Sequence, residues 1–394
     1  MSMPDTRRTE EKWSPGRKLG YHLLAGLIIV LPALMNQAPL FYSDSGTYMR
    51  FSFALEPPVD RPIGYSLIIR AVTWQASMWP VVFFQGAMAS WLIMTVLRQL
   101  FPGMERLWRA HLLVVGLLTF TSSLGWYASQ VMPDVLAGFL GIMIFIVFFG
   151  RRVNRLGLAF LWVCMFFFTI AHYSFMAMIG VMILFLLVLR ATRWGKRVMV
   201  VNFWRNWLGL VAVLTAGFLF LMNLNDRYER GAVLSPTSGL FMAGKLCESG
   251  VMYEHLHRVC KEHHRPICDR MNELDRPGMH YVWDEGAPIR EHYEDMIEAS
   301  VHADTLVSEV LSDPRNWGML AWTTIHATLV QLAQIDVGAG LEPYRENSGP
   351  WYVYRERLPQ ELPLYMNSLQ QRGLLPIDTV DLIATPTLYV ALFG

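Results

Sequence analysis

The feature that most constrains this chain is a series of apolar stretches, each about twenty residues long, within its first 224 residues. A helix of about twenty apolar residues crosses the hydrocarbon core of a bilayer. Because hydrocarbon offers no hydrogen-bond partners, each stretch must form a helix or part of a closed barrel. Barrel strands alternate in polarity, whereas the run 140–149 is continuously apolar. The sequence therefore predicts an all-α polytopic membrane protein.

The apolar stretches predict a module of seven membrane-spanning helices at residues 19–41, 77–100, 110–129, 133–150, 155–172, 173–190 and 204–224. The polar residues 1–18 precede this module, which as a whole covers residues 19–224. The connection 42–76 is too long for a simple turn, and its second half is apolar but broken by Arg70 and Gln75. We therefore expect an interfacial or re-entrant helix there.

The basic residues of the predicted connections lie mainly on one side of the membrane. One side holds sixteen, namely Arg7, Arg8, Lys12, Arg17, Lys18, Arg98, Arg106, Arg109, Arg151, Arg152, Arg155, Arg190, Arg193, Lys196, Arg197 and Arg205, and the other holds three, Arg50, Arg61 and Arg70. Basic loops stay cytoplasmic. We therefore expect a multi-pass protein of the bacterial inner (plasma) membrane with a cytoplasmic N-terminus and an external loop 42–76.

Residues 225–378 form a polar stretch rich in His, Asp, Glu, Arg and Pro, with helical patterns and no alternating strands. Its length is sufficient for a domain, so we expect a mainly helical external, periplasmic-side domain. Residues 379–394 are apolar but too short to span, and we interpret them as the start of a further membrane segment in a truncated chain. The net charge of +1 gives no reason to expect nucleic-acid binding.

The densest polar cluster follows the first predicted span. It comprises Tyr42, Ser43, Asp44, Ser45, Gly46, Thr47 and Tyr48, and then Asp60, Arg61 and Pro62. A carboxylate at the membrane surface can act as a general base or bind a metal ion. The alternative is that Asp44 caps a helix beginning near Thr47.

Two further candidates face the same predicted compartment. Asp134 follows Pro133 at the external start of the fourth predicted span, where helix capping is the alternative. His172 lies at the external turn between the fifth and sixth predicted spans, where a plain interfacial position is the alternative. If the first and fourth spans are neighbours, Asp44 and Asp134 converge.

The predicted external domain holds three cysteines, and Cys164 lies inside the fifth predicted span. The three cysteines permit one disulfide and leave one thiol over. Cys260 and Cys268 close a short loop around Pro266 and are the preferred pair, with Cys247 left over. Four histidines, at positions 255, 257, 263 and 264, crowd the same region, but their spacing matches no familiar zinc pattern.

A patch of one aromatic and two acidic residues, Trp283, Asp284 and Glu285, is of the kind that lines sugar-binding clefts. A solvated loop explains this patch equally well. The sequence contains no Gly-rich phosphate loop, no serine nucleophile elbow and no HExxH motif.

The first 225 residues resemble the C-type glycosyltransferase superfamily of integral membrane enzymes. The resemblance lies in a cytoplasmic N-terminus, a first span, an external loop that opens with Tyr42-Ser43-Asp44-Ser45-Gly46-Thr47-Tyr48 and continues through Arg61-Pro62-Ile63-Gly64-Tyr65, and a second external loop with Pro133-Asp134. The chain lacks the paired Asp-Glu and the tryptophan-tryptophan-aspartate motif of some branches, which leaves the acceptor open.

The resemblance implies transfer of a sugar from a polyprenyl-phosphate carrier to an acceptor glycan, lipid or protein on the outer side of the bilayer. Asp44 would be the catalytic base, and Asp134 would hold the acceptor or, with Asp44, a divalent metal such as Mg or Mn. Arg61 and His172 would contact the lipid phosphate, since an arginine–phosphate bond is charge-assisted. Tyr48, Trp283 and Asp284 are further candidate substrate contacts.

Three other functions stay open. A transporter places polar or broken segments at mid-membrane between two related halves, whereas here the polar cluster is external and no repeat is visible. A non-catalytic envelope assembly protein would bind a partner through its outer domain and would not need Asp44. A membrane acyltransferase would use an intramembrane histidine, for which His172 is the candidate.

Overall fold

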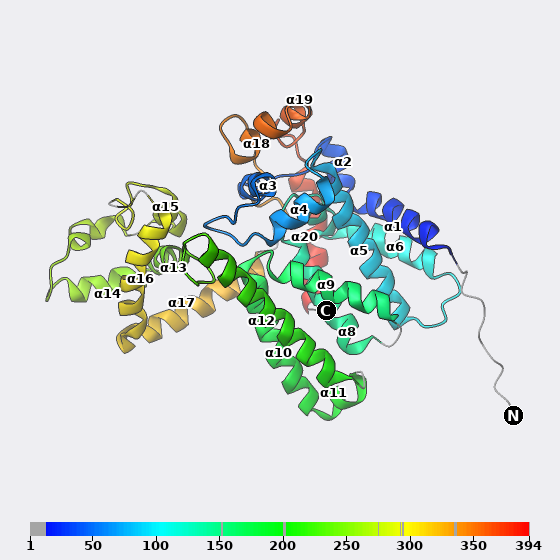
Figure 1. The fold of residues 1–394 in the computed structure, drawn as a ribbon, viewed down its shortest axis with the longest axis horizontal. Coiled ribbons are helices and arrows are strands. Elements are labelled where there is room, and N and C mark those ends of the chain that lie inside the picture. The colour runs from blue at the N-terminus through cyan, green and yellow to red at the C-terminus, as the bar shows by residue number, and fades with distance from the viewer. Residues whose placement is uncertain are drawn as a thin grey trace. The chain divides into compact units, whose positions relative to one another are not determined.

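The computed structural model describes residues 13–150, 153–199, 202–274, 276–291, 293, 295–334 and 337–393. Several residues of the predicted cytoplasmic segments, Arg7, Arg8, Lys12, Arg151 and Arg152, lie outside the described residues. Within the described ranges every regular element is a helix and none is a strand (Figure 1). The predicted all-α class is confirmed.

The chain divides into two compact units. The first contains the described residues of Met1–Glu56, Ile63–Gly217 and Asp336–Gly394, and the second contains those of Pro57–Pro62 and Phe218–Ile335. Residues 337–378, which the sequence groups with the external domain, thus pack in the first unit. The reason is long-range packing, since Tyr354 and Tyr365 stack on each other and pack edge-on against Phe41.

The helices of the first unit are α1 (Pro15–Ile29), α2 (Leu31–Asn36), α3 (Ser45–Ala54), α4 (Gly64–Thr73), α5 (Trp79–Leu100), α6 (Leu107–Thr121), α7 (Leu124–Ala128), α8 (Val135–Phe149), α9 (Arg155–Thr169), α10 (Tyr173–Ala191), α11 (Arg193–Val198), most of α12 (Phe203–Arg227), α18 (Gly349–Arg357), α19 (Leu362–Asn367) and α20 (Ile377–Phe393). Three of them, α5, α10 and α12, are long and apolar enough to cross a membrane. Three more, α6, α8 and α9, are apolar but shorter. These helices support a membrane protein, while the count of seven spans stays a prediction.

Two predicted spans are divided in the structure. The first span becomes α1 and α2, with a break at Val30. Pro32 lies in the first turn of α2, a position that proline tolerates. Because proline has no N–H and its ring clashes with the carbonyl four residues earlier, α1 does not continue through Pro32, and a new helix begins where a single span was expected. The third span likewise becomes α6 and α7, separated by the extended residue Ser122.

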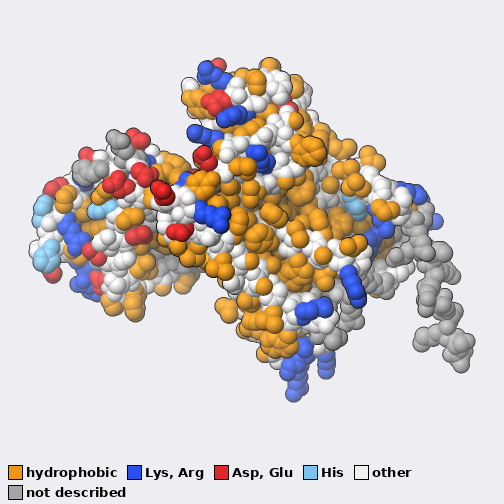
Figure 2. All heavy atoms as spheres, in the orientation of Figure 1, with side chains coloured by type: hydrophobic (Ala, Val, Ile, Leu, Met, Phe, Trp, Pro, Cys, Tyr) orange, Lys and Arg blue, Asp and Glu red, His pale blue; other side chains and the backbone are white. Residues whose placement is uncertain are grey.

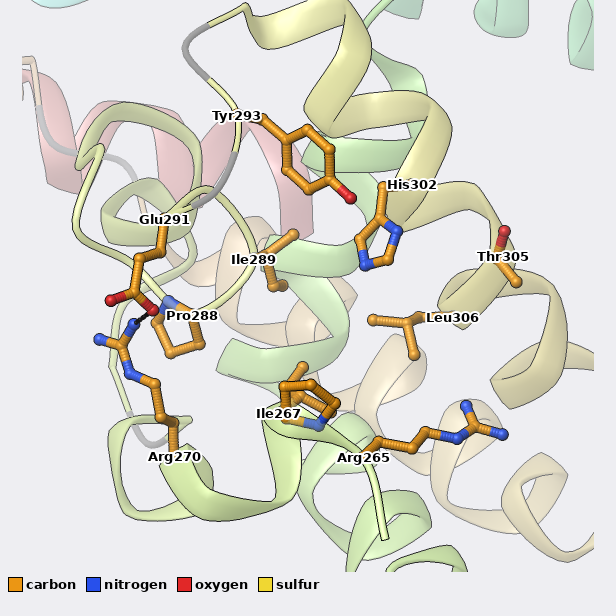
Figure 3. Close-up of a pocket in the computed structure, with 11 residues that line it drawn as sticks. Arg265, Ile267, Arg270, Pro288, Ile289, Glu291, Tyr293, His302, Thr305 and Leu306 are labelled. Carbon is orange, nitrogen blue, oxygen red and sulfur yellow. Dashed lines mark hydrogen bonds and ion pairs between the residues drawn. The ribbon is translucent and has the colours of Figure 1, made fainter. Parts of the chain in front are cut away.

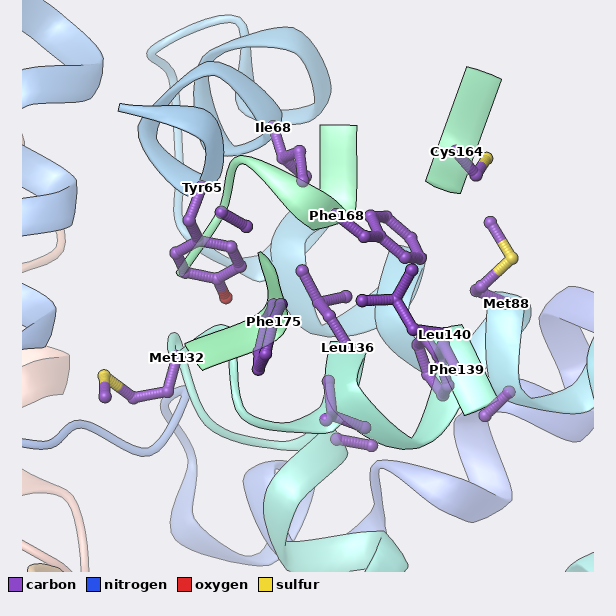
Figure 4. Packing of buried hydrophobic residues seen from close by; sticks show 14 of the residues in the cluster. Tyr65, Ile68, Met88, Met132, Leu136, Phe139, Leu140, Cys164, Phe168 and Phe175 are labelled. Carbon is purple, nitrogen blue, oxygen red and sulfur yellow. The ribbon is translucent and has the colours of Figure 1, made fainter. Parts of the chain in front are cut away.

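The core of the first unit centres on α8, whose residues Leu136, Phe139 and Leu140 are buried (Figure 4). Their spacing places them on one helix face. In Figure 4 this face packs towards Phe168 of α9 and Phe175 of α10.

Hydrophobic side chains also cover much of the visible face of the first unit (Figure 2). Leu113, Leu184 and Val188 are each more than 60% exposed. Large exposed apolar surfaces mark membrane or partner contacts. Since these residues lie on apolar helices, the exposed surface fits contact with lipid.

The helices α1 and α5 cross at a pair of glycines. A Cβ on Gly26 would come within 2.7 Å of the backbone nitrogen of Ala87, and a Cβ on Gly86 within 2.7 Å of the carbonyl oxygen of Gly26. Small residues allow membrane helices to approach closely, so that dispersion forces between the backbones stabilise the pair.

We expect Gly26→Val to separate α1 from α5 and to lower the free energy of unfolding by at least about 1–3 kcal/mol. Thermal unfolding of the detergent-solubilised protein measures the effect. Gly20→Val, on the same helix, is the matched control because a Cβ there meets no atom within 4 Å. Equal stability of the two variants would contradict close packing at Gly26.

The second unit contains α13 (Ser238–Glu248), α14 (Val251–Val259), the 3₁₀ helix η1 (Pro266–Glu273), α15 (Gly278–Trp283), α16 (Met296–Ser312) and α17 (Pro314–Ala333). Its separate hydrophobic core includes Leu240, Leu256, Tyr281 and Val310, all buried. A disulfide joins Cys260 to Cys268 with a Cα–Cα distance of 5.8 Å, the pairing that the short loop predicts.

Candidate functional site

The segment that leads to Asp44 is paired with the segment that leads to Asp134. Leu40 forms a parallel bridge with Gln130. The Leu40 N–H donates to the Ser129 carbonyl, and the Val131 N–H donates to the Leu40 carbonyl, each at 2.9 Å. Since Asp44 and Asp134 both follow their bridged residue by four positions, the pairing brings the two acidic segments side by side.

The other side of the same segment is held by Gln370. Its Oε1 accepts from the Phe41 N–H at 3.0 Å, and its Nε2 donates to the Phe41 carbonyl at 2.6 Å. The Gln370 N–H in turn donates to Oδ1 of Asn36 at 2.7 Å. All three residues are fully buried. The backbone before Asp44 is therefore hydrogen-bonded from both sides, which restricts where the carboxylate can lie.

Asp44 and Asp134 each occupy the position just before a helix, α3 and α8 respectively. Neither carboxylate makes a capping hydrogen bond to its helix. The Ser43 hydroxyl donates to Oδ1 of Asp44 at 3.2 Å. Asp44 is half-buried and Asp134 is exposed. The capping alternative thus lacks the hydrogen bond that would define it.

Two tyrosines and an amide connect α3 to α4 and α5. Tyr48 packs edge-on against Tyr65, with 5.2 Å between ring centroids, and the Tyr65 hydroxyl donates to Oε1 of Gln85 at 2.7 Å. Gln85 donates to the carbonyls of Ala128 and Gln130. Tyr48 is therefore buried in packing.

Asp134 lies close enough to Tyr65 to influence its pKa. Burial first, and then the negative charge of Asp134 and the neighbouring phenol of Tyr48, raise the pKa of Tyr65 well above its usual range. Tyr65 thus packs against a residue of α3, the helix that follows Asp44, and is close enough to Asp134 to be affected by its charge.

The loop that holds His172 lies against the start of α4. The Gly64 N–H donates to the Ile170 carbonyl at 3.1 Å, and a Cβ on Gly64 would approach that oxygen to 2.3 Å. Only glycine permits this contact. His172 itself caps α10, since its Nδ1 accepts from the Ser174 N–H. The structure thus gives His172 a structural role and places its loop beside α4.

Arg61 belongs to the second unit, where it forms an ion pair with Asp60 at 2.9 Å. Their side chains are only 12% and 7% exposed. The guanidinium charge is therefore already balanced by a carboxylate. A shared site of Arg61 with Asp44 and Asp134 stays a prediction.

The second unit contains a cavity of about 440 Å³ (Figure 3), within the usual range for small-ligand sites. It is lined by Arg265, Pro266, Ile267, Arg270, Pro288, Ile289, Glu291, Tyr293, His302, Thr305 and Leu306. Both arginines are paired with glutamates, Arg265 with Glu309 and Arg270 with Glu273 and Glu291. The cavity is thus a mixed polar and apolar site with no excess positive charge.

The predicted sugar contacts Trp283 and Asp284, both described, do not line this cavity. Trp283 packs edge-on against Phe241, and Asp284 pairs with His280 at 3.1 Å and accepts the Gly286 N–H. These contacts are those of a structured surface turn. A sugar-binding role for the two residues stays a prediction.

Among the described residues no group of three or more His, Cys, Asp or Glu side chains could hold a metal ion. Cys164 and Cys247 are buried free thiols, and burial raises the pKa of Cys247 to about 12. A thiol held in its neutral form is a poor nucleophile and a poor metal ligand.

His255 lies in a buried polar cluster of the second unit. Asn316 Nδ2 donates to its Nδ1 at 3.1 Å, and Asp313 Oδ2 lies 3.5 Å from the same nitrogen. Arg258 and Arg315 also pair with Asp313. Burial lowers the pKa of His255 below 6.5, although Asp313 acts in the opposite direction. The folded unit therefore holds this imidazole neutral.

The side chains that position the acidic segments were not identified from the sequence. Gln85 had a visible signal, because an amide inside an apolar helix must find partners. Asn36 had the same signal, because it lies inside the predicted span 19–41. Gln370 had no such signal, since it looks like an ordinary polar residue of the predicted external domain.

No protein family, curated protein or solved structure matches this chain. The functional argument therefore rests on the residues and their geometry.

We expect Gln370→Ala to leave the buried N–H and carbonyl of Phe41 without partners, at a cost of about 1–3 kcal/mol for each group. Thermal unfolding of the solubilised protein measures the loss. Asn367→Ala is the control, because Asn367 is exposed and bonds only locally, to the Pro363 carbonyl. If both variants unfold at the same temperature, Gln370 does not hold the segment.

We expect the free energy of unfolding of the second unit to fall as the pH drops through 6.5. Below that pH the unfolded chain protonates His255, whereas the folded unit resists protonation, so the unfolded state binds more protons. The decline levels off once the folded imidazole is also protonated. His255→Gln should reduce this pH dependence, and His257→Gln, exposed on the same helix, should not. Equal pH profiles for all three proteins would disprove the assignment.

Proposed function

We propose that the chain is a membrane glycosyltransferase of the C-type, with seven spans and a cytoplasmic N-terminus in a bacterial inner membrane. It moves a sugar from a polyprenyl-phosphate carrier to an acceptor glycan, lipid or protein on the outer face. The observation that carries the proposal is the placement of Asp44. Its carboxylate lies at the start of α3, is half-buried, and follows a backbone segment that is hydrogen-bonded from both sides.

Asp44 acts as the general base in this proposal. Its carboxylate takes the proton of the acceptor hydroxyl while the acceptor oxygen forms a bond to the anomeric carbon of the sugar. The bond from that carbon to the phosphate oxygen breaks, and polyprenyl phosphate leaves with the electron pair. Asp134, whose segment runs beside that of Asp44, orients the acceptor through a second hydroxyl.

Arg61 and His172, the predicted contacts to the lipid phosphate, both take part in other interactions. Arg61 can bind the phosphate only if it breaks its ion pair with Asp60. Breaking the pair is costly because it leaves the largely buried carboxylate of Asp60 without its counter-charge. His172 uses Nδ1 for its helix cap. Asp44 and Asp134 would be the ligands of a divalent metal such as Mg or Mn, although among the described residues no group of three or more His, Cys, Asp or Glu could hold a metal ion.

The competing functions predict different behaviour of Asp44. A transporter or a non-catalytic assembly protein does not need a base at the outer surface. Of the two, the assembly protein is the stronger rival, because the second unit has its own core and a disulfide that suit a separate binding domain.

The test compares sugar transfer by the wild-type protein with transfer by Asp44→Asn and Asp44→Ala, each as the full chain in membranes. The donors are polyprenyl phosphates carrying radiolabelled hexoses or pentoses, with the cell-envelope fraction as acceptor, and the release of polyprenyl phosphate is measured. We expect both variants to lose about a hundred- to ten-thousand-fold in rate. Unfolding is measured for both variants, and Asp44→Asn should keep wild-type stability, because asparagine retains the size of the side chain and an oxygen that can accept the Ser43 hydroxyl.

Asp295→Asn is the control for the chemical change itself. Asp295 does cap a helix, as its carboxylate accepts from the Ile297 N–H at 3.2 Å, and asparagine caps about equally well. It should keep both stability and transfer. Normal transfer by Asp44→Asn would remove the base assignment and leave the assembly protein as the better reading.

A further inference from the structure

The helix α17 has an unusual surface for part of a polar domain. Its first half packs against α14 and α16. From Thr324 to its end at Ala333 every residue is exposed, including Ile325 (55%), Leu329 (61%) and Leu332 (57%). About 15 Å of helix thus lies outside the core of the second unit.

The exposed stretch carries no formal charge with histidine neutral. Between Arg315 and Gln334 there is no Lys, Arg, Asp or Glu, and the one ionisable side chain, that of His326, packs beside the Trp322 ring. A solvated helix face normally carries charged residues. Water is therefore a poor environment for this surface.

The polar residues of α17 are largely satisfied within the helix. The hydroxyls of Thr323, Thr324 and Thr328 donate to the carbonyls of Met319, Leu320 and Thr324 respectively, at 2.7–2.9 Å. Such internal bonding lowers the cost of placing a hydroxyl in a poorly hydrated environment.

The apolar residues form one stripe. Trp322, Ile325, Leu329 and Leu332 follow the spacing of a single helix face, whereas Gln331 lies about 200° from Leu329 around the axis. Tryptophan is enriched where a protein meets the edge of the bilayer. The helix is amphipathic, with an uncharged polar side.

The second unit is also attached to a membrane helix. It includes Phe218–Arg227, the end of the candidate span α12, where Leu219 is 62% exposed. The unit therefore includes the end of a helix that is long and apolar enough to cross a membrane.

We infer that the second half of α17 is a membrane-docking helix that lies in the bilayer interface. The Trp322–Ile325–Leu329–Leu332 stripe contacts acyl chains, and the side with Gln331 faces the headgroups. A lipid surface suits this helix better than a protein partner, because the stretch offers no charge for specific pairing. The inference does not depend on the proposed transferase activity.

The test uses the full chain in phosphatidylcholine–phosphatidylglycerol vesicles, with a spin label at Leu329→Cys or Gln331→Cys. Collision rates with oxygen, which concentrates in lipid, and with a water-soluble nickel chelate report the surroundings. Val301→Cys, on an exposed site of α16, is the control. We expect the oxygen-to-nickel ratio at Leu329 to exceed that at Gln331 and Val301 several-fold.

Other outcomes overturn the inference. A low ratio at both α17 positions would place the helix in water. An immobile label at Leu329, shielded from both reagents, would indicate a second copy or another protein on the stripe. High oxygen-to-nickel ratios at both Leu329 and Gln331 would mean that the helix is fully inserted in the bilayer and does not lie in its interface. If Leu329→Cys fails to fold, a spin label at Leu332→Cys repeats the test.

Discussion

The backbone of Leu40 and Phe41 is the point on which the organisation of the first unit depends. Strand-like bonds to residues 129–131 occupy one side, and the side chain of Gln370 supplies the bonds on the other. A buried non-helical segment must have its N–H and carbonyl groups paired. The pairing here satisfies that requirement and sets the register between the two acidic segments.

The same requirement explains the buried amides of this apolar protein. Gln85 accepts from a tyrosine and donates to two loop carbonyls, and Asn36 bonds the turn at Ala38 and the backbone of Gln370. Each amide has both a donor and an acceptor, so one side chain can serve a loop that lacks regular structure. The buried amides thereby pair the backbone groups of the loops between the apolar helices.

The sequence predicted what depends on local pattern. Apolar blocks gave the all-α class and most helix positions, and a short loop around Pro266 indicated the disulfide. It did not predict the division of the chain, because the packing of Phe41 with Tyr354 and Tyr365 joins residues far apart in sequence. It identified Asp44 and Asp134 as candidates, but the pairing of the segments that lead to them rests on the Leu40–Gln130 bridge, which no local pattern signals.

The contact between Phe41 and Gln370 spans 329 residues of sequence. During synthesis the segment before Asp44 emerges early, whereas Gln370, which supplies its second set of hydrogen bonds, follows 329 residues after Phe41. Loop closure over such a distance is entropically costly and comes late in folding. The acidic segment therefore takes its final form only after the chain has been made as far as Gln370, so chains that stop before this residue carry an unfinished site.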